Sequence, residues 1–215
     1  MVKSLRGPVR HGGLFSLLRL KKKKMKIAIL SGSIRKGRRS HKIAVELQNR
    51  FIRAGFGATD VIDLGETALP LLEDERFHLN SSPTPAMSDI HHRLNDADAI
   101  IFLSPEYHGS YTGTLKNAID YFWSEFTKKP IGVVAVSAGK FGGINTSTLL
   151  QQLVLSLGAF PMPTKLLVPM VENAFNENDV VIDEPLSKSI DKFVSEFTWF
   201  ADAIISKKTG RRQQR

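Results

Sequence analysis

The sequence contains no cysteine. That absence excludes a disulfide framework, a thiolate nucleophile and any cysteine-ligated zinc or iron–sulfur centre. The sequence also lacks an apolar run of the roughly 18–20 residues that a membrane-spanning helix needs, so we expect no membrane span. With 42% hydrophobic and 24% charged residues over 215 positions, its composition is typical of a globular chain with one hydrophobic core.

Acidic residues are missing from both ends of the chain. Residues 1–24 carry five lysines and three arginines, and residues 206–215 carry two lysines and three arginines. Residues 25–205 hold 21 acidic against 17 basic residues, so the net charge of +9 comes from the two ends. Because no aromatic residues interleave with these basic runs, we expect solvated tails and no nucleic-acid partner.

The first 24 residues read as an extension of a domain that opens at Met25. Their apolar piece, Leu14–Leu18, is shorter than the roughly 7–15 residues of a signal-peptide core, and no small-residue cleavage site follows it. An acid-free leader with arginines resembles an organellar transit peptide, but this one is poor in serine. We expect residues 1–24 to be disordered or not native to the domain, residues 25–205 to form one domain, residues 206–215 to be a basic tail, and the protein to be cytoplasmic.

Buried-strand patterns alternate with helical patterns five times along this domain. The strands are expected at Ile27–Ser31, Thr59–Leu64, Asp98–Ser104, Ile131–Ser137 and Leu166–Val171. The helices are expected near residues 40–53, 85–95, 115–126, 149–157 and 190–204. This alternation predicts an α/β fold, a doubly wound five-stranded parallel sheet of flavodoxin-like order 2-1-3-4-5 with helices on both faces.

The loop after the first expected strand, residues 31–40, has the composition of an anion site. It combines glycines, hydroxyl side chains and Arg35 just before a helix, which suits a phosphate group. An exposed turn in which Ser40 caps the helix explains the same residues equally well. The loop matches neither the P-loop nor the Gly-x-Gly-x-x-Gly pattern, so sites for nucleoside triphosphates and ordinary dinucleotides are poorly supported.

Two further strand ends carry unusual loops. Residues 104–113 include Pro105-Glu106-Tyr107-His108-Gly109-Ser110, which suits a flat ring that needs stacking and hydrogen bonds, or which simply covers the strand end. Residues 137–143 are rich in glycine, so their backbone can approach a ligand closely, although turn chemistry alone also accounts for them. Since ligands of such sheets bind at the carboxyl ends of the strands, the three loops together indicate a binding site.

These loops resemble those of the NADPH-dependent FMN reductase family, which includes flavodoxin-like azo, quinone and chromate reductases. The resemblance covers roughly residues 25–170 and depends on three segments, Ser31-Gly32-Ser33-Ile34-Arg35 with Ser40, Pro105–Ser110 with Leu115–Asp120, and Gly139–Gly143. It implies an FMN-binding domain, NADPH or NADH as the hydride donor, and a quinone, azo compound, free flavin or metal oxyanion as the small-molecule acceptor. It also implies a homodimer or homotetramer, for which Phe122, Trp123 and Phe126 would supply apolar surface.

The resemblance further implies a set of FMN-binding positions. Around the phosphate it places Ser33, Arg35, Ser40 and His41; along the ribityl chain and ring Pro105, Glu106, Tyr107 and His108; and near the pyrimidine edge Ser137, Gly139 and Gly143. Ser31 and Gly109 are also expected among the FMN-binding positions. Lys140 would reach the flavin or the nicotinamide phosphate, or remain solvated. His41 and His108 depart from the asparagine found in many relatives. The flavin carries the chemistry, so we expect no catalytic side chain, and no metal site from His11, His78, His91 and His92.

Two other functions remain open at this point. A flavodoxin-like electron carrier would hold FMN without its own nicotinamide turnover, but the loop residues Arg35, Arg38 and Arg39 argue against it, because carriers usually have a threonine-rich phosphate loop and an acidic surface. An accessory subunit would keep the fold and use the basic tails for docking.

Overall fold

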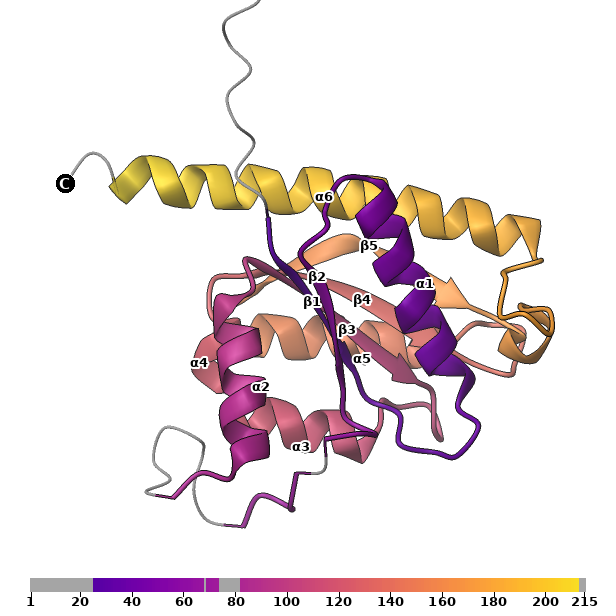
Figure 1. Ribbon diagram of the computed structural model, residues 1–215, viewed down its shortest axis with the longest axis horizontal. Coiled ribbons are helices and arrows are strands. Elements are labelled where there is room, and N and C mark those ends of the chain that lie inside the picture. Colours follow the sequence, from indigo (N-terminus) through magenta and orange to yellow (C-terminus); the bar gives the residue numbers. More distant parts are fainter. Residues whose placement is uncertain (1–24, 68, 74–81, 213–215) are drawn as a thin grey trace, which may run out of the picture.

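The computed structural model describes residues 25–67, 69–73 and 82–212, with side chains described as far as residue 206 (Figure 1). The expected N-terminal extension, the last three residues, His11 and His78 therefore lie outside the described residues. The elements follow in the order β1 Ile27–Ser31, α1 Arg39–Arg53, β2 Thr59–Asp63, α2 Pro85–Asp96, β3 Ala99–Pro105, α3 Gly113–Tyr121, α4 Trp123–Phe126, β4 Pro130–Val136, α5 Ile144–Ser156, β5 Phe160–Val168, a 3-10 turn η2 at Val171–Asn173, and α6 Glu184–Arg212.

The five strands form one parallel sheet of order β2-β1-β3-β4-β5, which confirms the predicted topology. β1 lies between β2 and β3, and its last residue, Ser31, pairs with Asp63 on one side and Leu103 on the other. All strands run the same way, so their carboxyl ends share one edge. The strand order reverses between β1 and β3, which is where sheets of this type bind ligands.

Helices cover both faces of the sheet, α1 and α6 on one side and α2 to α5 on the other (Figure 1). Alternate residues of β1 serve the two cores: Ile27 and Ile29 pack with α1 and α6, whereas Ala28 and Leu30 pack with the other helices. Burial on both faces explains why β1, β3 and β4 have unbroken apolar sequences. Over the described ranges, no helix has both the length and the apolarity to cross a membrane.

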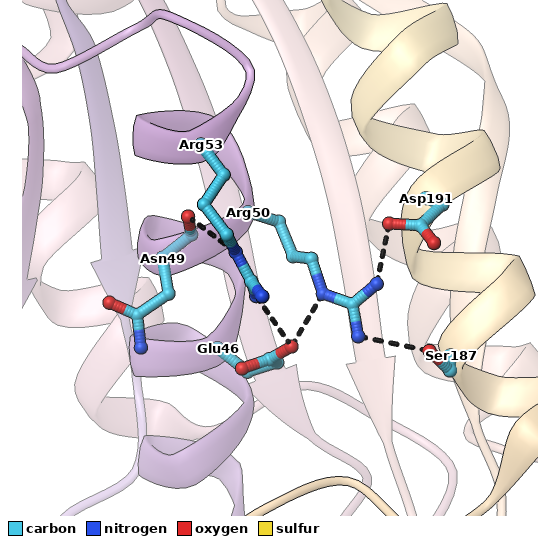
Figure 2. Close-up of polar contacts among 6 residues, drawn as sticks. All are labelled: Glu46, Asn49, Arg50, Arg53, Ser187 and Asp191. Atoms are coloured by element: carbon cyan, nitrogen blue, oxygen red, sulfur yellow. Dashed lines mark hydrogen bonds and ion pairs between the residues drawn. The ribbon is translucent and has the colours of Figure 1, made fainter.

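Arg50 ties α1 to α6 (Figure 2). Its guanidinium donates to Glu46 Oε1 at 2.6 Å within α1, and to Asp191 Oδ1 at 2.6 Å and Ser187 Oγ at 2.9 Å on α6. Burial lowers the pKa of Arg50, but the hydrogen bonds to Glu46 and Asp191 and the negative charges of these two carboxylates together raise the pKa overall. A hollow of about 980 Å³ beside this contact is lined by Met25, so it lies at the amino end of β1, away from the strand-end loops.

The structure corrects the bounds of the fifth strand. β5 begins at Phe160 and ends at Val168, whereas Leu166–Val171 was expected. Among the described strands, β5 lies at the edge of the sheet and pairs with β4. The edge tolerates Pro161 and Pro163 because an edge strand has one side without ladder partners. Beyond Val168 the chain leaves the sheet at Pro169 and forms η2.

The helix expected over residues 115–126 is divided at Phe122, whose φ of −116° and ψ of 49° separate α3 from α4. Phe122 and Phe126 are fully buried, so the expectation that they supply intersubunit surface is wrong. Phe126 meets Phe102 of β3 edge-on at 5.3 Å between ring centroids, which explains its burial. Trp123, between them, is 43% exposed.

Candidate active site

The three loops meet at the carboxyl edge of the sheet, around a cleft of about 380 Å³. That volume lies within the range of about 300–1,000 Å³ typical of small-molecule sites. Of the residues predicted from the sequence, the cleft is lined by Ser33, Arg35, Ser40, Pro105, Glu106, Tyr107 and Ser137. The remaining lining residues are Lys36, Gly37, Arg38, Arg39, Val136, Ala138, Val171 and Glu172.

The start of α1 forms the cationic end of the cleft. Arg38 occupies the N-cap position, and its side chain makes no capping hydrogen bond. Ser40 lies inside the first turn and is buried, so the alternative in which Ser40 caps the helix is wrong. First-turn amides without a side-chain cap, together with the positive end of the helix, attract an anion. Arg35 adds a second cation to the cleft wall, with its Cζ 5.7 Å from the centre of the Tyr107 ring.

Gly32 lets the first and second loops approach closely. Its amide donates to Leu103 O at 2.9 Å, and its carbonyl accepts from Thr112 Oγ1 at 2.7 Å. A Cβ atom at this position would lie 2.7 Å from Leu115 Cβ, so only glycine fits without movement. Thr112, which the sequence analysis did not single out, also caps α3 by accepting from Leu115 N at 3.2 Å.

The second loop turns through His108 and Gly109. Tyr107 and Ser110 exchange backbone hydrogen bonds of 2.8 and 3.1 Å, and the two residues between them have φ angles of 50° and 77°. Two consecutive positive φ angles are the mark of a type I′ turn, which favours asparagine and glycine. His108 and Gly109 build this turn and do not line the cleft.

Glu106 links the second loop to the third. Its Oε2 accepts from the amide of Thr146 at 2.9 Å, in the first turn of α5. The N-cap of α5 is Gly143, which has a φ of 82° and no side chain to offer. A Cβ at Gly143 would lie 2.9 Å from Ala135 Cβ, so a residue with a capping side chain does not fit there without movement. The carboxylate of Glu106 accepts the first-turn hydrogen bond instead.

The third loop also brings η2 to the cleft. Ser137 donates its amide to Val168 O at 2.9 Å and accepts from Val171 N at 3.1 Å, which places Val171 and Glu172 on the wall. The side chain of Ser137 accepts from Gly139 N at 3.0 Å. Lys140 is exposed and lines a neighbouring hollow of about 440 Å³. Gly139 and Gly143 likewise lie outside the cleft wall.

Two predicted FMN-binding residues lie behind the first loop. Within the described part of the chain, the buried Ser31 Oγ has no hydrogen-bond partner. His41 Nδ1 lies 2.9 Å from Oδ2 of Asp63, a carboxylate that sequence reasoning missed. Its position at the end of β2, on the same edge as the three loops, is the signal that could have identified it.

The histidines of α2 show no metal arrangement. His91 Nδ1 lies 2.6 Å from Oε1 of the buried Glu125 on α4, so this pair joins two helices. Among the residues that the structure describes, no three histidine or acidic side chains are grouped so that they could hold a metal ion.

The model of a family described as NADPH-dependent FMN reductase matches residues 25–173. The chain belongs to that family. The residues of the cleft fit FMN on structural grounds: the start of α1 suits a phosphate, and the side chain of Tyr107 suits a flat ring. The family assignment confirms an FMN-using, NAD(P)H-dependent oxidoreductase.

Individual relatives support this placement of the reductase. It is 31% identical over 193 residues to an FMN-dependent NADPH-azoreductase of Staphylococcus haemolyticus, covering 85% of this chain and 94% of the relative. It is 28% identical to a quinone reductase of Pseudomonas putida, covering 79% and 92% of the two chains. Among solved structures, FerB, a flavoenzyme NAD(P)H:(acceptor) oxidoreductase of Paracoccus denitrificans, superposes with a TM-score of 0.71 and 26% identity, covering 85% and 98%.

Proposed function

We propose that this reductase takes hydride from NADPH or NADH and reduces a flat or small acceptor, namely a quinone, azo compound, free flavin or metal oxyanion. The observation that carries the proposal is the single cleft in which a cationic helix start, Tyr107 and the third loop meet at the point of strand reversal. The names of the azoreductase and quinone reductase relatives support the acceptor class.

Different residues of the cleft would bind different parts of FMN. Ser33, Arg35 and Ser40, with the first amides of α1, would hold the FMN phosphate. Pro105, Glu106 and Tyr107 would flank the ribityl chain and ring, and Ser137 would face the ring's polar edge. When bound, FMN supplies the redox chemistry, receiving hydride from the nicotinamide and passing two electrons to the acceptor. The protein orients it, and the loop amides would stabilise negative charge near that edge.

Four of the expected FMN contacts take an indirect part in this proposal. Ser31, His41, His108 and Gly109 would shape the loops from behind or beside the cleft. Gly139, Gly143 and the cation of Lys140 would act from the third loop at its rim. We also propose a homodimer or homotetramer and keep the cytoplasm as the expected location.

An absorbance spectrum of the purified protein, taken before and after anaerobic addition of NADPH, tests the proposal. We expect flavin bands that bleach with NADPH and return when a quinone or azo dye is added. Flavin bands that NADPH leaves unchanged would instead identify an electron carrier. A colourless protein that also fails to bind added FMN would contradict the reductase function and favour an accessory role.

A further inference from the structure

Behind the first loop, one buried carboxylate gathers three nitrogen atoms. Asp63, at the carboxyl end of β2, is 5% exposed. Its Oδ2 pairs with Arg38 Nη2 and lies 2.9 Å from His41 Nδ1, and its Oδ1 accepts from Gly65 N at 2.8 Å. Asp63 lies outside the cleft wall, so it does not face the ligand directly.

The two side-chain partners belong to the start of α1. Arg38 is the N-cap residue, and His41 lies in the first turn. The guanidinium of Arg38 rests against the turn after β2, where a Cβ at Gly65 would lie 2.4 Å from Arg38 Nη1. That turn is itself fixed to β1, because Leu64 N donates to Ser31 O at 3.1 Å. The side chain of Arg38 therefore connects the helix start to this edge of the sheet, and His41 Nδ1 lies beside the same carboxylate.

Among the four cations of this loop, the ion pair separates Arg38 from the others. The side chain of Arg38 is 18% exposed and paired, whereas Arg35, Lys36 and Arg39 are exposed. Charge alone would make Asp63 unfavourable for an anion, because a carboxylate near the loop repels phosphate and neutralises one of its cations. On that ground, removing the charge of Asp63 should strengthen anion binding. If Asp63 instead holds the loop in place, removing its charge should weaken anion binding.

We propose that Asp63 is a positioning residue for the phosphate end of FMN, acting through Arg38 and His41 on the first turn of α1. This inference rests on the proposed function, which places the phosphate at that turn. For FMN affinity, the correct placement of the first-turn amides of α1 outweighs the repulsion between Asp63 and the phosphate. The reason is that the phosphate depends on several hydrogen bonds that must converge on one point.

The test compares FMN with riboflavin, which lacks the phosphate, by quenching of flavin fluorescence on the apoprotein. In Asp63→Asn the Kd for FMN should rise about tenfold or more, as expected for weakened charge-assisted contacts, while the Kd for riboflavin changes less than about twofold. Asn keeps an oxygen acceptor for Gly65 N. Asp60→Asn is the matched control, because Asp60 is also a carboxylate of β2 paired with an arginine, Arg93 of α2, at 2.7 Å. It should leave both constants unchanged.

A second variant approaches the same contact from the helix side. Arg38→Gln alone should weaken FMN binding. In a double variant with Asp63→Asn it should cause little further loss of FMN affinity, because each change breaks the same Arg38–Asp63 contact. Full additivity would overturn the inference. So would unchanged or tighter FMN binding in Asp63→Asn, or an equal loss for FMN and riboflavin.

The wild type separates failure of this inference from failure of the proposed function. If it binds FMN no more tightly than riboflavin, the phosphate site itself is wrong, and the inference falls with it. If the wild type prefers FMN to riboflavin and Asp63→Asn prefers it to the same degree, only the positioning role of Asp63 is overturned.

Discussion

At the residue scale, the site depends on one close approach at Gly32. Replacing Gly32 with alanine would place a Cβ 2.7 Å from Leu115 Cβ and 2.8 Å from Thr112 Oγ1. Because the first of these neighbours belongs to the packed core, we expect Gly32→Ala to lower the free energy of unfolding by about 1–3 kcal/mol. Thermal denaturation followed by circular dichroism would detect the corresponding fall of several degrees in Tm.

Gly113→Ala is the control for this prediction. Gly113 begins α3, and apart from its chain neighbours and the nearby backbone of its own helix, no described atom lies within 4 Å of its ideal Cβ position. Alanine should therefore be neutral or slightly stabilising there. If the two variants melt at the same temperature, the close contact at Gly32 does not constrain the fold.

Sequence reasoning identified cleft residues where they form part of a contiguous motif. Arg35 and Tyr107 belong to such motifs, and both line the cleft. Asp63 was missed because its partners, Arg38 and His41, come from another segment, and only the register of β2 beside β1 brings the three together. The alternative in which Ser40 caps the helix fails because the N-cap lies two residues earlier, at Arg38.

At the element scale, Glu106 joins two loops by serving the first turn of α5. Glu106→Ala would remove the acceptor for Thr146 N and a negative charge at the start of the helix. We expect a loss of about 1 kcal/mol in the free energy of unfolding. Glu106→Gln keeps an acceptor and should lose about half as much. Urea titration measures both values.

Glu172→Ala is the matched control for Glu106. Glu172 lines the same cleft from η2, so its removal changes the charge of the site by the same amount. It lies outside the first turn of α5, and we expect little change in stability, within the range of about 0.5 kcal/mol usual for surface substitutions. Equal losses in the two variants would show that cleft charge, rather than the contact with α5, determines stability.

The elements themselves were predictable where burial enforces a simple pattern. β1, β3 and β4 are buried on both faces, and their apolar runs predicted that these strands exist and roughly where each begins and ends. β5 was misplaced because its prolines suggest a loop, and only its edge position makes them tolerable. The break at Phe122 was missed because the apolar spacing continues through it into α4.

At the scale of the whole molecule, the strand order followed from the alternation of strands and helices and the handedness of their connections. The surface between subunits could not be derived in the same way, because a helical pattern does not distinguish a side chain buried in its own core from one buried by a partner. Phe122 and Phe126 are buried in the core, which leaves Trp123 as the exposed aromatic of the three.

Trp123 lies beside a hollow of about 310 Å³ that α3, α4 and α5 share, lined also by Leu153 and Leu157. Apolar surface of this kind is typical of an interface between subunits. We therefore expect the wild type to sediment as a dimer or tetramer of the 23.9 kDa chain, and Trp123→Glu to shift it to the monomer. Trp199→Glu is the control, because Trp199 is 74% exposed on α6, across the sheet. A monomeric wild type, or dissociation by Trp199→Glu alone, would exclude this face as the interface.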